Sequence, residues 1–94
     1  MSDFKIKRII DQDFLDFVKT LPCIACTSEP SDPDHITTRG AGGHDEATNV
    51  WPLCREHHVL RHLKGLRFMI QNFPSCRIWL ENAGRHDILD KYDT

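Results

Sequence analysis

The fold of this chain is decided by residues 54–62, which have the sequence CREHHVLRH. Cys54 and His57 are separated by two residues, a spacing that lets both side chains turn onto one metal ion. An earlier CxxC pair, Cys23 and Cys26, has the same spacing. Two such pairs in one short chain are typical of a closed tetrahedral site, so we predict that these four side chains bind a structural zinc ion.

The cysteines also permit other interpretations. Cys23 and Cys26 can be two buried thiols that bind no metal. A redox-active CxxC pair is disfavoured, because no βαβ pattern surrounds it. Cys76 has no partner at metal-binding spacing and lies in an apolar segment, so we expect it to be a small core residue.

Two further histidines follow within the same stretch. His58 and His62 are four residues apart, so a helix places both imidazoles on one face, where they can share one ion. His57 lies about 100° around that helix from His58, because the helical period is 3.6 residues. We therefore expect His57 to face the zinc knuckle while the other two histidines face a hairpin groove. The alternative is that the i, i+4 pair is a coincidence on the surface.

The segment between the two ligand pairs, residues 27–53, has the pattern of a β-hairpin. β-branched residues predict a short strand at 35–38, and the glycine-rich stretch 40–43 allows a sharp turn. The returning strand is expected at 49–53. A knuckle, a hairpin and a helix with ligands at its start form a treble-clef-like zinc module.

Helices are expected on both sides of this hairpin. Apolar residues recur at helical spacing over 11–21, and Pro22 ends that helix. Gly65 and Gly84 are suited to the C-terminal ends of later helices. The expected segments are a loose arm at 1–10, helices at 11–21, 55–64, 66–72 and 74–83, and a polar tail at 85–94.

Length and composition indicate one domain over residues 1–94. Apolar residues make up 39% of the chain and charged residues 28%, which is ordinary for a globular protein. The sequence shows neither an apolar run of membrane-spanning length nor the apolar core of a signal peptide. We therefore expect a cytoplasmic protein without a membrane partner, and we disfavour a secreted domain held by disulfides.

The charge balance gives no support to a role in coating nucleic acid. Twelve Lys and Arg residues oppose fourteen Asp and Glu residues, which gives a net charge of −2. Proteins that bind nucleic acid non-specifically are usually basic. The informative excess is six histidines, because neutral imidazole is both a metal ligand and a general base near neutral pH.

Taken together, these motifs resemble the HNH endonucleases, an α+β superfamily with the ββα-metal (His-Me finger) motif, here with an added structural zinc. The resemblance covers residues 11–65 and is strongest to small phage-type members, including the recombination-enhancement nucleases. The matching motifs are PCxxC at 22–26, DHI at 34–36, GxGG at 40–43, NxxPLC at 49–54 and HHxxxH at 57–62.

The resemblance implies a role for each matching residue. His35 would be the general base that takes a proton from the attacking water, and Asn49 would hold the hairpin loop and the His35 ring by hydrogen bonds. The implied ligands of a catalytic divalent ion, Mg²⁺ or another, are Asp34, His58 and His62. The implied ligands of the structural zinc are Cys23, Cys26, Cys54 and His57. His57 stands where many members have a fourth cysteine, and imidazole is an ordinary zinc ligand.

Adjacent strand residues point to opposite faces, so Asp34 and His35 reach one site only if the strand starts irregularly, as Pro33 suggests. Arg39 and Arg61 are candidates for contacts with DNA phosphates, with a solvated surface charge as the alternative. The pair at 44–45, His44 and Asp45, can touch DNA or metal, but we expect a solvated loop tip there.

The sequence therefore predicts a metal-dependent DNA endonuclease that hydrolyses phosphodiester bonds with a histidine base and one divalent ion. The alternative is a catalytically silent treble-clef zinc module that binds nucleic acid or protein. Such a module needs only the four zinc ligands, so Asp34, His35, Asn49, His58 and His62 discriminate between the two. The sequence leaves the oligomeric state open.

Overall fold

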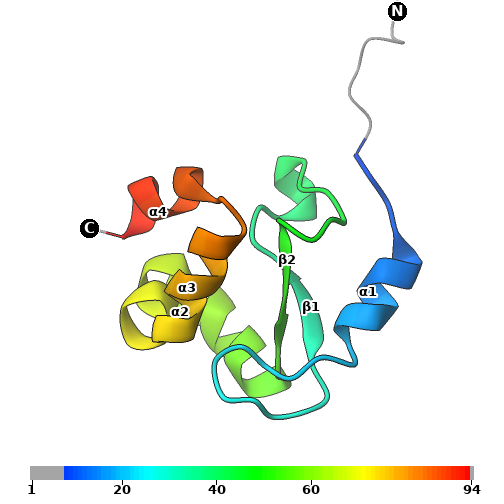
Figure 1. Ribbon diagram of the computed structural model, residues 1–94, viewed down its shortest axis with the longest axis horizontal. Coiled ribbons are helices and arrows are strands. Elements are labelled where there is room, and N and C mark those ends of the chain that lie inside the picture. Colours follow the sequence, from blue (N-terminus) through cyan, green and yellow to red (C-terminus); the bar gives the residue numbers. More distant parts are fainter. Residues whose placement is uncertain (1–7, 94) are drawn as a thin grey trace, which may run out of the picture.

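A two-stranded antiparallel sheet lies at the centre of the molecule (Figure 1). The structure is a computed structural model that describes residues 8–93. β1 (Asp32–His35) pairs with β2 (Val50–Leu53). Within the described residues, four α-helices and one short 3₁₀ helix, η2 (Arg39–Ala41), complete an α+β fold. The α+β class predicted from the sequence is thereby confirmed.

β1 begins earlier than the predicted strand at 35–38. Pro33 lies opposite Pro52 in the observed register. Each strand of a two-stranded sheet has one edge without a neighbouring strand, so a residue that lacks an N–H fits there. The β-branched residues 36–38 instead lead into the hairpin loop, although the Ile36 N–H still donates to the Asn49 carbonyl at 2.8 Å.

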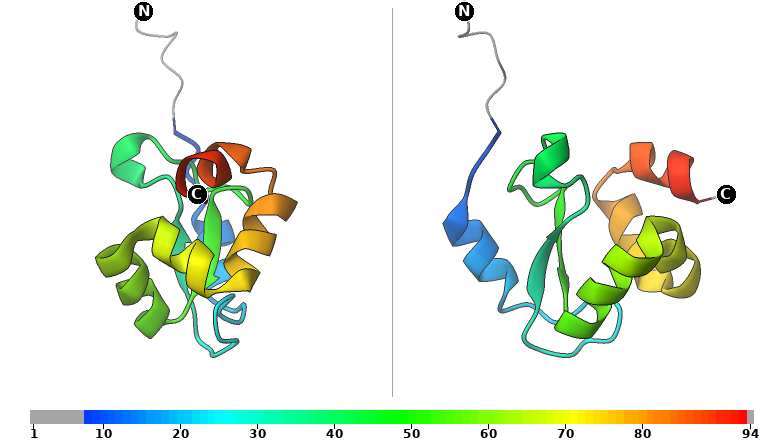
Figure 2. Two further views of the ribbon diagram at one scale, coloured as in Figure 1. Left: turned by 90° about the vertical axis from the view of Figure 1, so that its left-hand side faces the viewer. Right: turned by 180° about the vertical axis from the view of Figure 1, so that it is seen from behind.

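α1 (Gln12–Val18) lies against one side of the sheet (Figures 1 and 2). Its N-cap is Asp11, whose side chain accepts a hydrogen bond from the Phe14 N–H. Leu15 and Val18 are buried and pack with Val50 of β2. The helix ends before residue 21, because the next residues form tighter turns that bond back to its last carbonyls.

α2 (Arg55–Asn72) and α3 (Pro74–Asn82) lie on the other side of the sheet (Figure 2). The helices expected at 55–64 and 66–72 are two halves of α2, joined at a kink. Gly65 forms that kink with φ 88° and ψ 173°, a conformation that glycine adopts without a steric penalty. α3 begins at Pro74 as predicted.

The C-terminal segment differs from the polar tail predicted at 85–94. Residues His86–Tyr92 form a helix, α4, whose Ile88 is buried in the main core. Short helices are stabilised mainly by tertiary packing, so one buried residue in a polar segment gave only a weak sequence signal.

The predicted arm also differs where it is described. Its residues 1–7 lie outside the described residues, but the segment that follows is attached to the hairpin loop. Ile9 accepts a backbone hydrogen bond from Asp45 at 2.9 Å, and its own N–H donates to Nδ1 of His44 at 2.7 Å.

The main core lies between the sheet and α2, α3 and α4, around the fully buried side chain of Trp51. Cys76 is buried in this core, as predicted, and burial raises the pKa of its thiol to about 12. Among residues 8–93, the structure contains no helix with the length and apolar character of a membrane span.

Candidate metal centres

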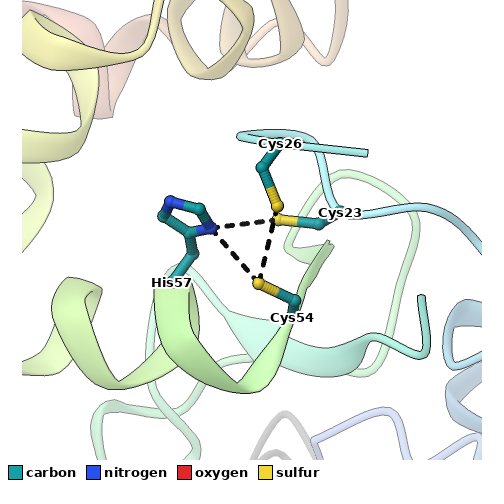
Figure 3. Close-up of side chains that lie close together, drawn as sticks. All are labelled: Cys23, Cys26, Cys54 and His57. Atoms are coloured by element: carbon teal, nitrogen blue, oxygen red, sulfur yellow. Dashed lines mark hydrogen bonds between the residues drawn. The ribbon is translucent and has the colours of Figure 1, made fainter. Parts of the chain in front are cut away.

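Four predicted zinc ligands meet at the start of α2 (Figure 3); this Cys/His cluster consists of Cys23, Cys26, Cys54 and His57. The Sγ atoms of Cys26 and Cys54 are 3.7 Å apart. Nδ1 of His57 lies 3.7 Å from Sγ of Cys23 and 3.2 Å from Sγ of Cys54. A tetrahedral zinc ion places sulfur ligands about 3.8 Å apart and sulfur and nitrogen ligands about 3.6 Å apart. The cluster can therefore hold a metal ion such as zinc.

Backbone contacts position the two halves of the Cys/His cluster. The Ile24 N–H donates to the Pro52 carbonyl at 3.0 Å, which joins the CxxC turn to β2. Cys54 is the N-cap residue of α2, so the helix starts at the cluster. Hydrogen bonds from Ser28 lower the pKa of the exposed Cys26 thiol to about 6, whereas burial raises the pKa of Cys54.

A second group, the Asp/His cluster, consists of Asp34, His58 and His62. Oδ1 of Asp34 lies 3.3 Å from Nε2 of His58 and 3.1 Å from Nε2 of His62. A divalent ion with bonds of about 2.1 Å separates neighbouring ligand atoms by about 3.0 to 3.4 Å, depending on the coordination geometry. The three side chains thus have the spacing of ligands to one ion. α2 separates the two clusters as predicted, with His57 in one and His58 in the other.

The buried carboxylate of Asp34 has one oxygen fixed by the protein. Its Oδ2 accepts hydrogen bonds from Nε1 of Trp51 at 2.7 Å and from Nε of Arg61 at 2.9 Å. Trp51 is the cross-strand neighbour of Asp34 in the sheet. The other oxygen of Asp34, Oδ1, faces the two histidines of the cluster.

Arg61 has a different position from the one expected for a contact with DNA phosphates. The residue is 8% exposed, and its guanidinium also donates to the carbonyls of His35 and Ile36. Its side chain lies on the face of α2 that covers the sheet, so it holds Asp34 and the end of β1 in place. The other candidate, Arg39, has a side chain that is 52% exposed.

Asp32 is a member of this site that the sequence reasoning missed. Its Oδ2 lies 3.0 Å from Nδ1 of His58, the ring nitrogen that faces away from Asp34. A histidine that binds metal usually donates its second ring N–H to a carboxylate, which fixes the ring. The signal was available, because residues i and i+2 of a strand share a face, and Asp32 precedes Asp34 by two.

The Asp/His cluster lies in an open cleft of about 500 Å³. Asp34 and His35 both line it, although they are adjacent. β1 ends at His35, so the strict alternation of strand side chains stops there. The lining residues are Leu15, Pro33, Asp34, His35, Thr38, Arg39, Gly40, His58 and His62.

Asp45 is buried, in contrast to the solvated loop tip expected at 44–45. It is 2% exposed, and its Oδ1 lies 2.7 Å from Nε2 of His35. Burial opposes ionisation, but hydrogen bonds from the Asp11 backbone and the His35 ring lower the pKa of Asp45 below its ordinary value. The burial arises because the segment around Ile9 folds back over this loop.

Asn49 holds the hairpin loop, as the resemblance implied. Its side chain exchanges two hydrogen bonds with the Thr37 backbone, at 2.9 and 3.0 Å, and donates to the His44 carbonyl at 2.9 Å. Among residues 8–93 it makes no hydrogen bond to the His35 ring, whose partner is Asp45. Arg85, which precedes α4, donates to the Asn49 side chain at 3.0 Å and was not anticipated.

The loop leaves no room for a side chain at Gly43. An added Cβ would lie 1.8 Å from the Thr37 carbonyl oxygen and 2.8 Å from Nδ2 of Asn49. Gly43→Ala is therefore expected to destabilise the protein by about 1 to 3 kcal/mol, as overpacking does. Gly40→Ala is the control, since its Cβ would meet nothing within 4 Å. Urea denaturation measures both, and equal stabilities would contradict the close packing of the loop.

Comparison with known proteins gives a family for the chain. Residues 1–70 match the family described as "Protein of unknown function (DUF968)". The chain is 34% identical over 67 residues to "Uncharacterized protein YdfU" of Escherichia coli (strain K12), a match that covers 68% of the chain and 19% of that protein. The chain thus spans about a fifth of the length of this relative. No solved structure matches the chain. Since the match covers most of the sequence, the chain belongs to the DUF968 family.

Proposed function

We propose that this chain is a metal-dependent DNA endonuclease of the HNH type, in which β1, β2 and the first half of α2 form a ββα-metal motif. One observation supports this above all: Asp34, His58 and His62 converge in a cleft that His35 also lines. A silent zinc module needs only the Cys/His cluster, so it gives no reason for a second cluster beside a histidine.

The proposed reaction is hydrolysis of a phosphodiester bond. The oxygen of a water molecule bonds to phosphorus while the bond from phosphorus to the leaving sugar oxygen breaks. His35 accepts the proton of the attacking water, and the leaving oxygen takes a proton from solvent. A divalent ion held by the Asp/His cluster would neutralise charge on the phosphate and on the leaving oxygen.

The substrate would enter along the open cleft. Arg39 lines the cleft, and its exposed guanidinium suits a phosphate contact. The chain as a whole has a net negative charge. We therefore expect DNA binding to depend on the ion as well as on basic side chains. Imidazole ligands suit transition ions, whereas carboxylate suits Mg²⁺, so both kinds of ion belong in the assay.

The test is cleavage of supercoiled plasmid and single-stranded DNA with Mg²⁺, Mn²⁺ or Zn²⁺, and with EDTA. His62→Ala is expected to raise the ion concentration that half-maximal activity needs, by 10-fold or more as an order of magnitude. The fold should persist, because the His62 side chain is 50% exposed. His57→Ala should instead lower the melting temperature, because it removes a ligand of the Cys/His cluster.

His86→Ala is the matched control, since His86 is an exposed histidine at the start of α4 outside both clusters. It should leave both the ion dependence and the melting temperature unchanged. If the folded wild-type protein cuts neither plasmid nor single-stranded DNA, whichever ion is supplied, the nuclease proposal is contradicted and the silent zinc module is favoured.

A further inference from the structure

We propose that Asp45 is a positioning residue for His35, and that its buried carboxylate fixes both the orientation and the tautomer of the imidazole. This inference rests on the proposed function, because it takes His35 to be the general base. It concerns a residue outside both metal clusters and outside every motif of the family resemblance.

The contact between the two side chains is short and shielded from water. Oδ1 of Asp45 lies 2.7 Å from Nε2 of His35, and their side chains are 0% and 11% exposed. An ionised carboxylate only accepts hydrogen bonds, so Nε2 must carry the proton of the pair. A neutral ring then has its lone pair on Nδ1, which makes no hydrogen bond to any of residues 8–93. Nδ1 is thus the nitrogen that can accept a proton from water.

Three other groups hold the Asp45 carboxylate in place. Nη1 of Arg8 donates to Oδ1 at 3.0 Å, and the Asp11 backbone N–H donates to Oδ2 at 3.0 Å. Nε of Arg39 lies 3.8 Å from Oδ1. These donors and cations favour the ionised carboxylate, so Asp45 can act as an acceptor toward His35 without taking its proton.

The arrangement follows a general requirement of base catalysis by histidine. The ring must present an unprotonated nitrogen to water, and a carboxylate on the opposite nitrogen ensures this by fixing the tautomer. The segment 8–11 supplies two of the donors to Asp45. It therefore contributes to the geometry of His35 without lining the cleft itself.

The first measurement is NMR spectroscopy of the full chain labelled with ¹⁵N histidine, and it needs no DNA. We expect the ring N–H proton of His35 to be on Nε2. This proton should exchange slowly with water, because its carboxylate partner is buried. His35→Ala identifies the signal by its loss. In Asp45→Asn the ionic acceptor is gone, so this signal should vanish or move to Nδ1. If the His35 ring of the wild-type protein carries its proton on Nδ1 and not on Nε2, the inference is overturned. This test holds even if Asp45→Asn fails to fold.

The second readout is the rate of DNA cleavage. Asp45→Asn should lower kcat by about 10² to 10⁴-fold while KM for DNA and the ion dependence stay unchanged, since no metal ligand is altered. Asp11→Asn is the control for the same chemical change. Asn is an equally good N-cap, and the backbone N–H that Asp45 accepts remains, so ring signal and rate should match the wild type.

The outcomes separate the two proposals. An Asp45→Asn protein with the wild-type ring signal and rate overturns the positioning role and leaves the nuclease assignment standing. A wild-type protein that cuts no DNA overturns the nuclease assignment, and the positioning role with it.

Discussion

Replacing His35 by alanine is expected to lower the rate of DNA cleavage by about 10² to 10⁴-fold, which is the usual contribution of a general base. His35 belongs to neither metal cluster, so the ion content of both should survive. The fold should survive as well, because Asp45 keeps its hydrogen bonds from Arg8 and the Asp11 backbone. The measurement is kcat for plasmid nicking at saturating ion, with zinc content and melting temperature from the same preparation.

Asp34→Ala provides the contrast to His35→Ala. It removes a proposed metal ligand and leaves the Arg61 guanidinium without its buried carboxylate partner, so both ion dependence and stability should change. A His35→Ala protein that cuts DNA at the wild-type rate would remove the general-base assignment. It would also remove the main reason to prefer an enzyme over a silent zinc module.

Cys54→Ser is expected to release zinc and to unfold most of the protein. Structural zinc sites in small peptides bind with about 10 to 16 kcal/mol. That range is as large as the net stability of a typical domain, about 5 to 15 kcal/mol. Cys54 belongs to the Cys/His cluster and is the N-cap residue of α2, although its side chain makes no capping hydrogen bond, so the loss of stability is expected to come from the lost zinc ligand. Zinc analysis and circular dichroism measure the two effects.

Cys76→Ser is the matched control for Cys54→Ser. Cys76 is a second buried cysteine of the main core, and it lies outside the Cys/His cluster. Its replacement puts a hydroxyl among apolar side chains, with an expected loss of about 1 to 3 kcal/mol and full retention of zinc. Wild-type protein that purifies folded and free of zinc under non-chelating conditions contradicts the zinc assignment.

The two clusters of candidate metal ligands are the part of the site that the sequence predicts well. Spacings such as i, i+3 and i, i+4 become three-dimensional geometry within one turn of a knuckle or helix, with no help from the rest of the fold. Cys54 and His57, and likewise His58 and His62, are neighbours for this local reason. Gly65 and Pro74 mark helix geometry equally locally, through their own backbone preferences.

Features that depend on distant segments are the ones that the sequence leaves out. Asp45 is buried because residues 8–11 fold back over its loop, and nothing near position 45 encodes that contact. The register of β1 depends on the pairing of Pro33 with Pro52 across the sheet. α4 depends on a place for Ile88 in a core built by other elements. Each is a long-range contact, which local periodicity does not report.

His57 and His58 are consecutive residues of α2 but belong to different clusters. The number of residues in the first half of α2 is therefore more constrained than its composition. Exposed positions such as Val59 and Leu63 can change freely. One residue inserted after His57 would rotate His58 and His62 together by about 100° and turn both away from Asp34. Relatives with such an insertion or deletion are expected to keep the Cys/His cluster and to lose the Asp/His cluster. The number of residues between His57 and His58 is therefore a criterion for sorting family members into those that have both clusters and those that have the Cys/His cluster alone.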